Sequence, residues 1–85
     1  MTSKVIKFHA PWCGPCKRIR QMLDTKGITL QNHSVDDEPV LAAKYNVMQV
    51  PTFIAVDEEG QELARLAESD AIQVLEFIKK YDTIN

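Results

Sequence analysis

The sequence predicts an α/β fold, in which a four-stranded mixed sheet is flanked by three helices. Two observations lead to this class. Runs of residues typical of strands alternate with stretches of helical spacing, which is the pattern of strand–helix–strand units. The last two strand-like runs are separated only by "DEEG", residues 57–60, whose glycine suits a hairpin turn with a bulge. The elements therefore follow in the order strand, helix, strand, helix, strand, strand, helix.

The first half of the chain supplies the first four elements. "KVIKFH", residues 4–9, is β-prone, and the residues after Cys13 take up helical spacing until Gly27, which suits a helix stop. The next extended run is "ITLQNHSV", residues 28–35. The following "DDEP" provides acidic capping residues and a proline suited to a first helical turn. We expect that short helix to end at Asn46, because asparagine tolerates the left-handed conformation of a helix terminus.

The second half supplies a hairpin and a closing helix. "TFIAV", residues 52–56, and "QELARL", residues 61–66, are the two antiparallel strands. "SDAIQVLEFIKKY", residues 69–81, carries an apolar stripe behind a Ser/Asp cap. The first strand–helix–strand unit should be a parallel crossover. Its helix therefore begins just past the carboxyl end of a strand, where open α/β sheets usually place their chemistry.

Length and composition favour one domain spanning residues 1–85. The 85 residues are 45% hydrophobic and 26% charged, which suffices for one modest core but not for two. A formal net charge of -2 shows no basic excess, so we expect no nucleic acid ligand. The chain has no run approaching the roughly 18 apolar residues of a membrane span and no signal-peptide h-region. We therefore expect a cytoplasmic protein that does not bind membranes.

Both cysteines lie in "APWCGPCKRIR", residues 10–20. Cys13 lies at or just before the helix amino terminus, where unpaired N–H groups and the helix dipole favour a thiolate, so we predict that it is the nucleophile. Cys16 lies one turn later on the apolar stripe of the helix, so we predict that it is the more buried, resolving thiol. Gly14 and Pro15 permit a tight turn into the helix, with proline where an N–H would lack a partner.

Two other roles for the cysteine pair compete with redox chemistry. A structural disulfide is disfavoured, because so short a loop constrains little chain and the expected compartment is reducing. Zinc is the stronger rival, since His9 and His33 complete a Cys2His2 count, but neither histidine has the usual paired spacing. A C-x-x-C at the turn of a strand–helix–strand unit favours redox chemistry. We therefore expect no bound metal and treat both histidines as ordinary strand residues.

The motif "WCGPC" at residues 12–16, followed by "VPT" at residues 50–52, resembles the thioredoxin family, for which WCGPC is highly specific. The segments "FHAPWCGPCK", "VDDEPVLAAKYNV" and "EEGQELARL" are also similar to the family's active-site segment, second helix and terminal hairpin. The family's additional amino-terminal strand and helix have no counterpart, so the first strand here matches the family's central strand. The resemblance implies a thioredoxin-like fold in a domain of glutaredoxin size.

The resemblance implies roles for five residues by position. Cys13 matches the family's attacking cysteine and Cys16 its resolving cysteine. Trp12 resembles the tryptophan beside the family's active site. We expect its side chain to form a platform next to the cysteines and not to lie in the core. Pro51 matches the family's cis-proline, and Val50 before it can pair its backbone with an extended substrate.

Four positions depart from the family's pattern. Lys7 stands where the family has a buried aspartate that assists proton transfer with the resolving cysteine. Asn32 stands where a lysine is common in the family. Neither the aspartate nor the lysine of the family's usual acid–base pair is therefore present. His9 replaces a frequent aromatic residue, and Ala67 replaces a common glycine of the substrate groove. These changes bear on the reduction potential and on the choice of partner.

Lys7 has two interpretations. Alternation along residues 4–9 places it on the face shared with Val5 and His9, so it can lie beneath the active-site helix. An ammonium there would favour the Cys13 thiolate, and desolvation would lower its own pKa until the neutral amine could accept a proton. The alternative is a lysine whose stem is buried and whose ammonium reaches solvent.

Three cations, Lys17, Arg18 and Arg20, crowd the first turns of the same helix. Cations at this end oppose the helix dipole, so a compensating benefit is reasonable. They form either a patch that steers acidic partners or a solvated helix face.

The sequence therefore predicts a small thiol–disulfide oxidoreductase that reduces protein disulfides without a bound cofactor or metal. By resemblance, a flavin-dependent, NADPH-linked thioredoxin reductase would return the electrons, ribonucleotide reductase would be a typical recipient, and the protein would act as a monomer. Two alternatives stay open. One is a glutaredoxin-like electron donor reduced by glutathione, which the size suggests, and the other is a thioredoxin-like binding subunit of a larger assembly.

Overall fold

The computed structural model describes residues 2–83. Its elements are β1 (Lys4–His9), α1 (Gly14–Thr25), β2 (Gln31–Ser34), α2 (Pro39–Lys44), β3 (Thr52–Val56), β4 (Glu62–Leu66) and α3 (Ala71–Tyr81). The strands form one sheet in the order β2-β1-β3-β4. β1 pairs with β2 in parallel and with β3 in antiparallel orientation, and β4 is antiparallel to β3. The predicted four-stranded mixed sheet with three helices is confirmed.

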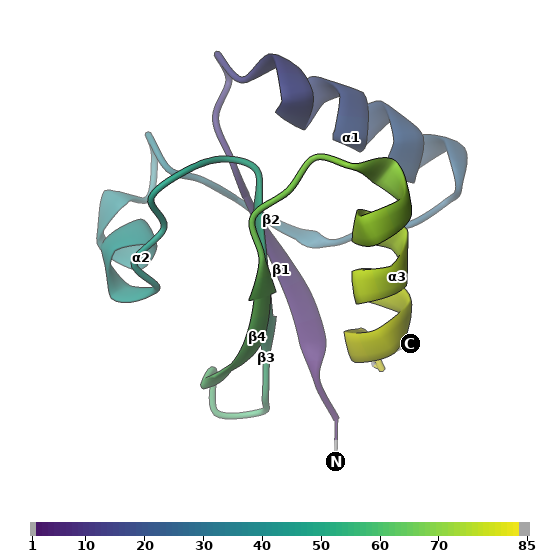
Figure 1. Ribbon diagram of the computed structural model, residues 1–85. Coiled ribbons are helices and arrows are strands. Elements are labelled where there is room, and N and C mark those ends of the chain that lie inside the picture. Colours follow the sequence, from purple (N-terminus) through teal and green to yellow (C-terminus); the bar gives the residue numbers. More distant parts are fainter. Residues whose placement is uncertain (1, 84–85) are drawn as a thin grey trace.

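Helices cover both faces of the sheet, with α1 and α3 on one face and α2 on the other (Figure 1). Alternation along the strands distributes the core between the two faces. Val5 of β1 and Phe53 of β3 pack against α1 and α3, whereas Ile6 and Phe8 of β1 pack against α2. β3, one of the two inner strands, is therefore buried along its whole length.

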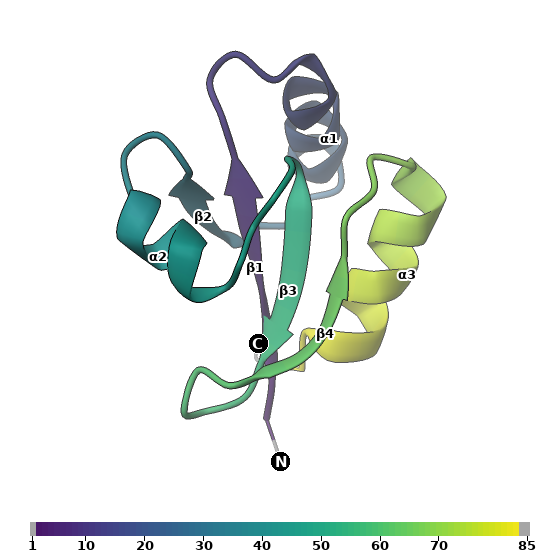
Figure 2. The ribbon, with the colours of Figure 1, turned by 60° about the vertical axis from the view of Figure 1, so that its left-hand side comes forward.

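One edge of the sheet brings distant segments together. β1 and β2 end at this edge and β3 begins there, because β3 runs antiparallel to the other two (Figure 2). The amino terminus of α1 and the segment that precedes β3 therefore lie next to each other at the top of Figure 2. This is the edge at which the sequence places its cysteines.

Strand β2 is shorter than the predicted run of residues 28–35 and begins only at Gln31. The backbone N–H of Ile28 donates to the Leu23 carbonyl at 2.9 Å and closes the end of α1, just after Gly27 with its φ of 70°. Leu30 is buried in the core beneath α1 and α3. Residues that finish a helix and fill the core in this way cannot extend the strand.

The predicted helix ends are confirmed in part. Pro39 occupies the first turn of α2, but Glu38, the residue before the helix, makes no side-chain capping bond, so the predicted acidic cap is wrong. Asn46 ends this segment with a φ of 52°, as predicted. Asp70 caps α3 by accepting the N–H of Ile72 at 3.1 Å.

The β3–β4 turn takes one residue more than predicted. Asp57 accepts the N–H groups of Glu59 and Gln61 on one carboxylate oxygen, each at 2.9 Å, and Gly60 adopts a φ of 81°. Gln61 therefore belongs to the turn, and β4 begins at the next residue. A register shift between Ala55 and Val56 supplies the expected irregularity of the hairpin.

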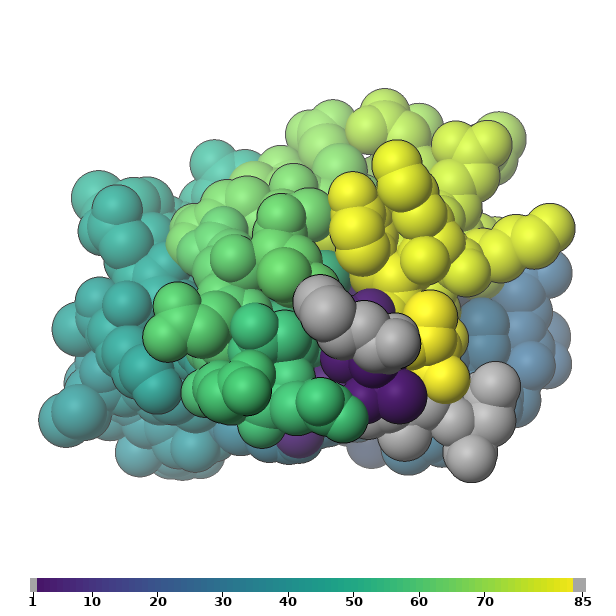
Figure 3. Space-filling view, turned by 90° about the horizontal axis from the view of Figure 1, so that it is seen from below, coloured from purple at the N-terminus to yellow at the C-terminus, as the bar shows by residue number. Residues whose placement is uncertain are grey.

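The two ends of the described chain meet at the opposite end of the molecule from the amino terminus of α1. The Ser3 N–H donates to Thr83 Oγ1 at 2.9 Å, and the Thr83 N–H donates to the Ser3 carbonyl at 3.0 Å. Figure 3 shows the first residues in purple, the end of α3 in yellow and the hairpin in green on one surface. Within residues 2–83, no helix has the length and apolar character needed to cross a bilayer.

Candidate active site

The cysteine pair lies at the amino terminus of α1, just after the end of β1. Cys13 is the N-cap residue of the helix, and its backbone N–H donates to the Ala10 carbonyl at 3.1 Å. Pro15 occupies the first turn, where its missing N–H leaves no helical hydrogen bond unmade, and an exposed Gly14 precedes it. Cys13 and Cys16 form a disulfide with their Cα atoms 5.3 Å apart. The structure therefore represents the oxidised protein.

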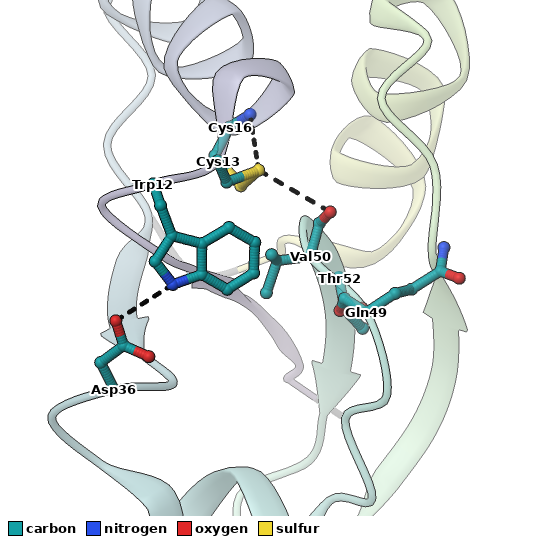
Figure 4. Close-up of a disulfide and its surroundings, with 7 residues drawn as sticks. All are labelled: Trp12, Cys13, Cys16, Asp36, Gln49, Val50 and Thr52. Carbon is teal, nitrogen blue, oxygen red and sulfur yellow. Dashed lines mark hydrogen bonds between the residues drawn. A yellow bond between two sulfur atoms is a disulfide. The ribbon is translucent and has the colours of Figure 1, made fainter.

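The Cys13 sulfur faces both the start of the helix and the segment before β3. It accepts the backbone N–H of Cys16 at 3.1 Å and lies 3.8 Å from the Val50 carbonyl oxygen (Figure 4). A disulfide sulfur has no proton, so it can donate to Val50 only after reduction to the thiol. The N–H that points at this sulfur and the helix dipole both favour a Cys13 thiolate in the reduced protein.

Burial does not distinguish the two cysteines. Both residues are 4% exposed in the oxidised form, so the greater burial of the Cys16 sulfur in the reduced protein stays a prediction. The disulfide joins them in one small ring at the helix start, against Ala10 and beneath the partly buried Val35 and Val50. The two cysteines differ in their surroundings: the Cys13 sulfur faces the Val50 carbonyl, whereas Cys16 lines a cavity beneath α1.

The Val50–Pro51 peptide bond is cis, as the resemblance implies. Thr52 Oγ1 donates to the Gln49 carbonyl at 2.6 Å and fixes the chain on either side of the proline. Pro51 is buried and Val50 is half-buried. The turn therefore presents the Val50 carbonyl oxygen to the disulfide.

Trp12 lies on the surface beside the disulfide. Trp12 is 70% exposed, so it does not lie in the core. The indole Nε1–H donates to Asp36 Oδ2 at 3.2 Å (Figure 4). This bond holds a large apolar ring in one orientation next to the sulfurs. Sequence reasoning missed Asp36 here, because it treated the "DDEP" segment only as a helix cap.

Gln49 is a second residue that sequence reasoning missed. Its side-chain Nε2 donates to the Ala67 carbonyl at 2.8 Å, and the bond links the segment before Pro51 to the segment after β4. The Gln49 side chain extends away from the sulfurs in Figure 4. No local pattern signals this contact, because its partners are 18 residues apart and meet only in the folded sheet.

Lys7 lies beneath α1, on the face that strand alternation predicts. It is 3% exposed and, together with Cys16, lines a cavity of about 520 Å³. Burial is the main cause that lowers the pKa of Lys7 below its ordinary value, and the charge of Arg20 lowers it further, whereas Asp24 raises it. The Lys7 stem is buried, whereas its amine is not among the fully buried atoms and lines the cavity, so both interpretations of Lys7 stay open. Asn32, the β2 residue in register with Lys7, lines the same cavity.

The two histidines have different surroundings. The His33 ring bonds to the Gln31 amide at 2.8 Å and to the Glu38 carboxylate at 2.9 Å. His9 lines the cavity beside Lys7, and burial followed by the positive charge of Lys7 lowers its pKa. In the part of the chain that the structure describes, no group of three or more His, Cys, Asp or Glu side chains is arranged to hold a metal ion.

The three cations of α1 are exposed, but they do not share one environment. Lys17 and Arg20 line the cavity that contains Lys7, whereas Arg18 lies outside its lining. Arg20 is also 4.0 Å from the Asp24 carboxylate one turn later. The cluster is therefore divided between the cavity wall and the outer surface of the helix.

A cysteine pair that closes a disulfide at the start of a helix, on the edge of a sheet of this topology, defines a thiol–disulfide exchange protein. The chain belongs to the thioredoxin family. The family model described as Thioredoxin matches residues 1–80. This match agrees with the family that the WCGPC motif resembles, and together with the disulfide it supports oxidoreductase chemistry.

Known proteins with similar sequence or structure agree with this assignment. The chain is 36% identical to the SPbeta prophage-derived thioredoxin-like protein YosR of Bacillus subtilis, over 73% of this chain and 78% of that protein. It is 39% identical to thioredoxin of Staphylococcus aureus, over 68% of this chain but only 61% of that thioredoxin's length. The structure of Fasciola hepatica thioredoxin matches with a TM-score of 0.82 and 28% identity, covering 95% of this chain and 82% of that one. The thioredoxin-like fold is thereby confirmed.

Proposed function

We propose that this protein is a thiol–disulfide oxidoreductase that reduces protein disulfides through Cys13 and Cys16. The observation that carries the proposal is the Cys13 sulfur, which lies at the helix amino terminus, receives the Cys16 N–H and faces the Val50 carbonyl. A sulfur so arranged is stabilised as a thiolate and is next to backbone that can hold a substrate strand.

The reaction proceeds by two disulfide exchanges. The Cys13 thiolate attacks one sulfur of a substrate disulfide, the substrate S–S bond breaks, and the other substrate sulfur leaves as a thiolate. The Cys16 thiolate then attacks the Cys13 sulfur, breaks the mixed disulfide and releases the second substrate thiolate. Two electrons pass to the substrate, whose two sulfurs take up protons, and the protein ends with the Cys13–Cys16 bond that the structure contains.

The residues around the sulfurs have supporting roles in this proposal. Val50 pairs its backbone with an extended substrate segment, and Pro51 brings that backbone to the disulfide without an N–H of its own. Trp12 offers an exposed ring on which the substrate packs. Gly14 and Pro15 form the turn that puts Cys13 at the helix terminus.

Lys7 acts on the resolving side. Its amine and Cys16 line the same cavity, and its pKa is lowered mainly by burial. As an ammonium it stabilises the thiolates electrostatically, and as a neutral amine it accepts the proton of the Cys16 thiol. It thereby takes over the task of the buried aspartate that the family usually carries at this position.

The oxidised protein needs an external source of electrons. In this proposal a flavin-dependent, NADPH-linked thioredoxin reductase supplies them, and the protein works as a monomer in the cytoplasm on protein disulfides, including that of ribonucleotide reductase. Neither a metal nor an organic cofactor takes part, because both exchange steps need only sulfur atoms.

The test compares the wild type with a Cys13→Ser, Cys16→Ser double variant. We expect the wild type to accelerate reduction of a model protein disulfide by dithiothreitol and the double variant to be inactive. A double variant that retains its cellular function would contradict the proposal and favour a binding subunit. Faster recycling by glutathione than by thioredoxin reductase would instead favour the glutaredoxin-like alternative.

The reduction potential is the complementary measurement. A potential near the cytosolic glutathione poise or below it supports reduction of substrates, whereas a potential far above it indicates an oxidase or isomerase. Equilibration with glutathione or dithiothreitol buffers gives this value.

A further inference from the structure

A cavity of about 520 Å³ lies beneath α1, on the inner side of the active-site disulfide. Its walls come from β1 and the loop after it, from α1, and from β2 with the segment that leads into it, and they include Cys16 but not Cys13. The volume is in the range of about 300–1,000 Å³ that is typical of small-molecule sites. The reduction of protein disulfides uses the outer side of the disulfide and gives this space no occupant.

The charges on the cavity wall are mainly positive. Lys7, Lys17 and Arg20 line it together with one carboxylate, Asp24. With Lys7 protonated and His9 neutral, three cations against one anion leave two positive charges. Asp24 lies 4.0 Å from Arg20 on the exposed side of the helix, where both side chains are largely in solvent. A surface pair of this kind neutralises Arg20 only weakly.

Among residues 2–83, His9 Nδ1 is the only buried side-chain polar atom without a hydrogen-bond partner, and His9 lines this cavity beside Lys7. Lys7 is 3% exposed, and within residues 2–83 its amine has no hydrogen-bond or ion-pair partner. The Lys7 amine itself is not among the fully buried atoms, so part of its surface is open to the cavity, where an anion can pair with it. Burial and the nearby Arg20 charge lower the pKa of Lys7, and the Asp24 carboxylate raises it only in part, so the cations of the site are incompletely compensated. Asn32 adds an amide donor to the same wall.

We propose that this cavity binds a small molecule through a phosphate-type dianion, which pairs with Lys7 and Arg20. A dianion matches the two net positive charges, whereas a carboxylate would leave one of them uncompensated. Arginine and lysine are also the side chains that proteins use to bind phosphate groups. The occupant would lie against Cys16, and the site goes beyond the proposed function because it requires no redox step.

Inorganic phosphate is the probe, and the oxidised protein is the sample. We expect saturable chemical-shift changes at the backbone amides of Lys7, Arg20 and Asn32 when phosphate is added near neutral pH. Sodium chloride at the same ionic strength and sodium acetate should not reproduce them. Because the disulfide remains intact throughout, the result does not depend on whether the protein is an oxidoreductase.

Three variants make the measurement specific. Lys7→Met keeps an apolar stem of similar length, and Arg20→Gln changes an exposed residue, so neither should prevent folding. Each should weaken phosphate binding by about tenfold or more, since it removes a charge-assisted hydrogen bond. Arg18→Gln is the matched control, because it makes the same change on the same helix outside the cavity and should bind phosphate like the wild type.

A comparison of inorganic phosphate with glycerol phosphate distinguishes free phosphate from a phosphate monoester as the natural occupant. Tighter binding of the monoester supports a phosphorylated small molecule, and equal binding supports phosphate alone. The proposal is overturned if the shifts follow ionic strength alone, or if Lys7→Met and Arg20→Gln bind phosphate as tightly as the wild type.

Discussion

Replacement of Lys7 by methionine should stabilise this protein. Lys7 is 3% exposed, and its amine has no partner among the described residues. Methionine retains the unbranched apolar stem, so the packing around α1 and β1 is conserved while the charged group is removed. The substitution therefore tests directly whether a desolvated amine lies in the cavity.

The size of the effect follows from this environment. A buried polar group without a hydrogen bond lowers stability by about 1–3 kcal/mol in protein mutational data. Because the Lys7 amine is not among the fully buried atoms, we expect the low end of this range: the free energy of unfolding of Lys7→Met should exceed that of the wild type by about 1 kcal/mol near neutral pH. For a domain of this size, each kcal/mol corresponds to a rise in Tm of about 4–8 °C.

The gain should depend on pH, and the lowered pKa of Lys7 sets its sign. The unfolded chain keeps the Lys7 proton up to the ordinary pKa of 10.5, whereas the folded protein releases it at lower pH because burial disfavours the ammonium. Between the two pKa values the unfolded state binds more protons, so wild-type stability rises with pH. The advantage of Lys7→Met is thus complete below the folded pKa and shrinks as pH approaches 10.5.

The assay is urea unfolding of both oxidised proteins at several pH values, in buffer without phosphate or other oxyanions. Lys79→Met, at an exposed position of α3, is the matched control and should change stability by no more than about 0.5 kcal/mol. A Lys7→Met protein no more stable than the wild type, or one with a gain that does not vary with pH, would refute the reasoning that Lys7 is a desolvated amine.

Three further predictions concern the chemistry of the sulfurs. In the reduced protein near neutral pH, brief iodoacetamide treatment should label Cys13 before Cys16, because Cys13 is the N-cap residue of α1; peptide mapping that finds Cys16 labelled first would reverse the assignment. Cys16→Ser should trap a stoichiometric mixed disulfide through Cys13, since release needs the second thiol, and rapid turnover by this variant would exclude the dithiol mechanism. Lys7→Met should raise the pKa of Cys13, as followed by thiolate absorbance, and should slow disulfide reduction most below that pKa; superimposable titration curves would mean that Lys7 takes no part in the chemistry.

Local sequence patterns predicted the features that depend on neighbouring residues. The bounds of β1 and β3 agree with the β-prone runs, and α1 begins immediately after Cys13, where Gly14 and Pro15 favour a helix start. Asn46 adopts its expected left-handed conformation. These features could be predicted because strand propensity, helix capping and turn conformation are set mainly by residues within one or two turns of each other.

Features that depend on packing were predicted less well. Residues 28–30 have the composition of a strand, but they close α1 and fill the core instead. Gln61 is contiguous with the strand-like run of residues 61–66, but its N–H donates to the Asp57 carboxylate, which holds Gln61 in the turn. In each case tertiary contacts outweigh the local preference of the residues, because strand propensity spans only about 1 kcal/mol.

The sequence by itself determined the family, the order of the elements, the position of the cysteines at a helix amino terminus and the side of the sheet to which Lys7 points. Only the tertiary structure decided that both cysteines are equally buried, that Trp12 bonds to Asp36, that Gln49 reaches Ala67 and that Lys7 lies in a cationic cavity with Cys16. The physical reason is distance along the chain. Motif, periodicity and alternation act over a few residues, whereas these contacts join segments that only the paired strands and packed helices bring together.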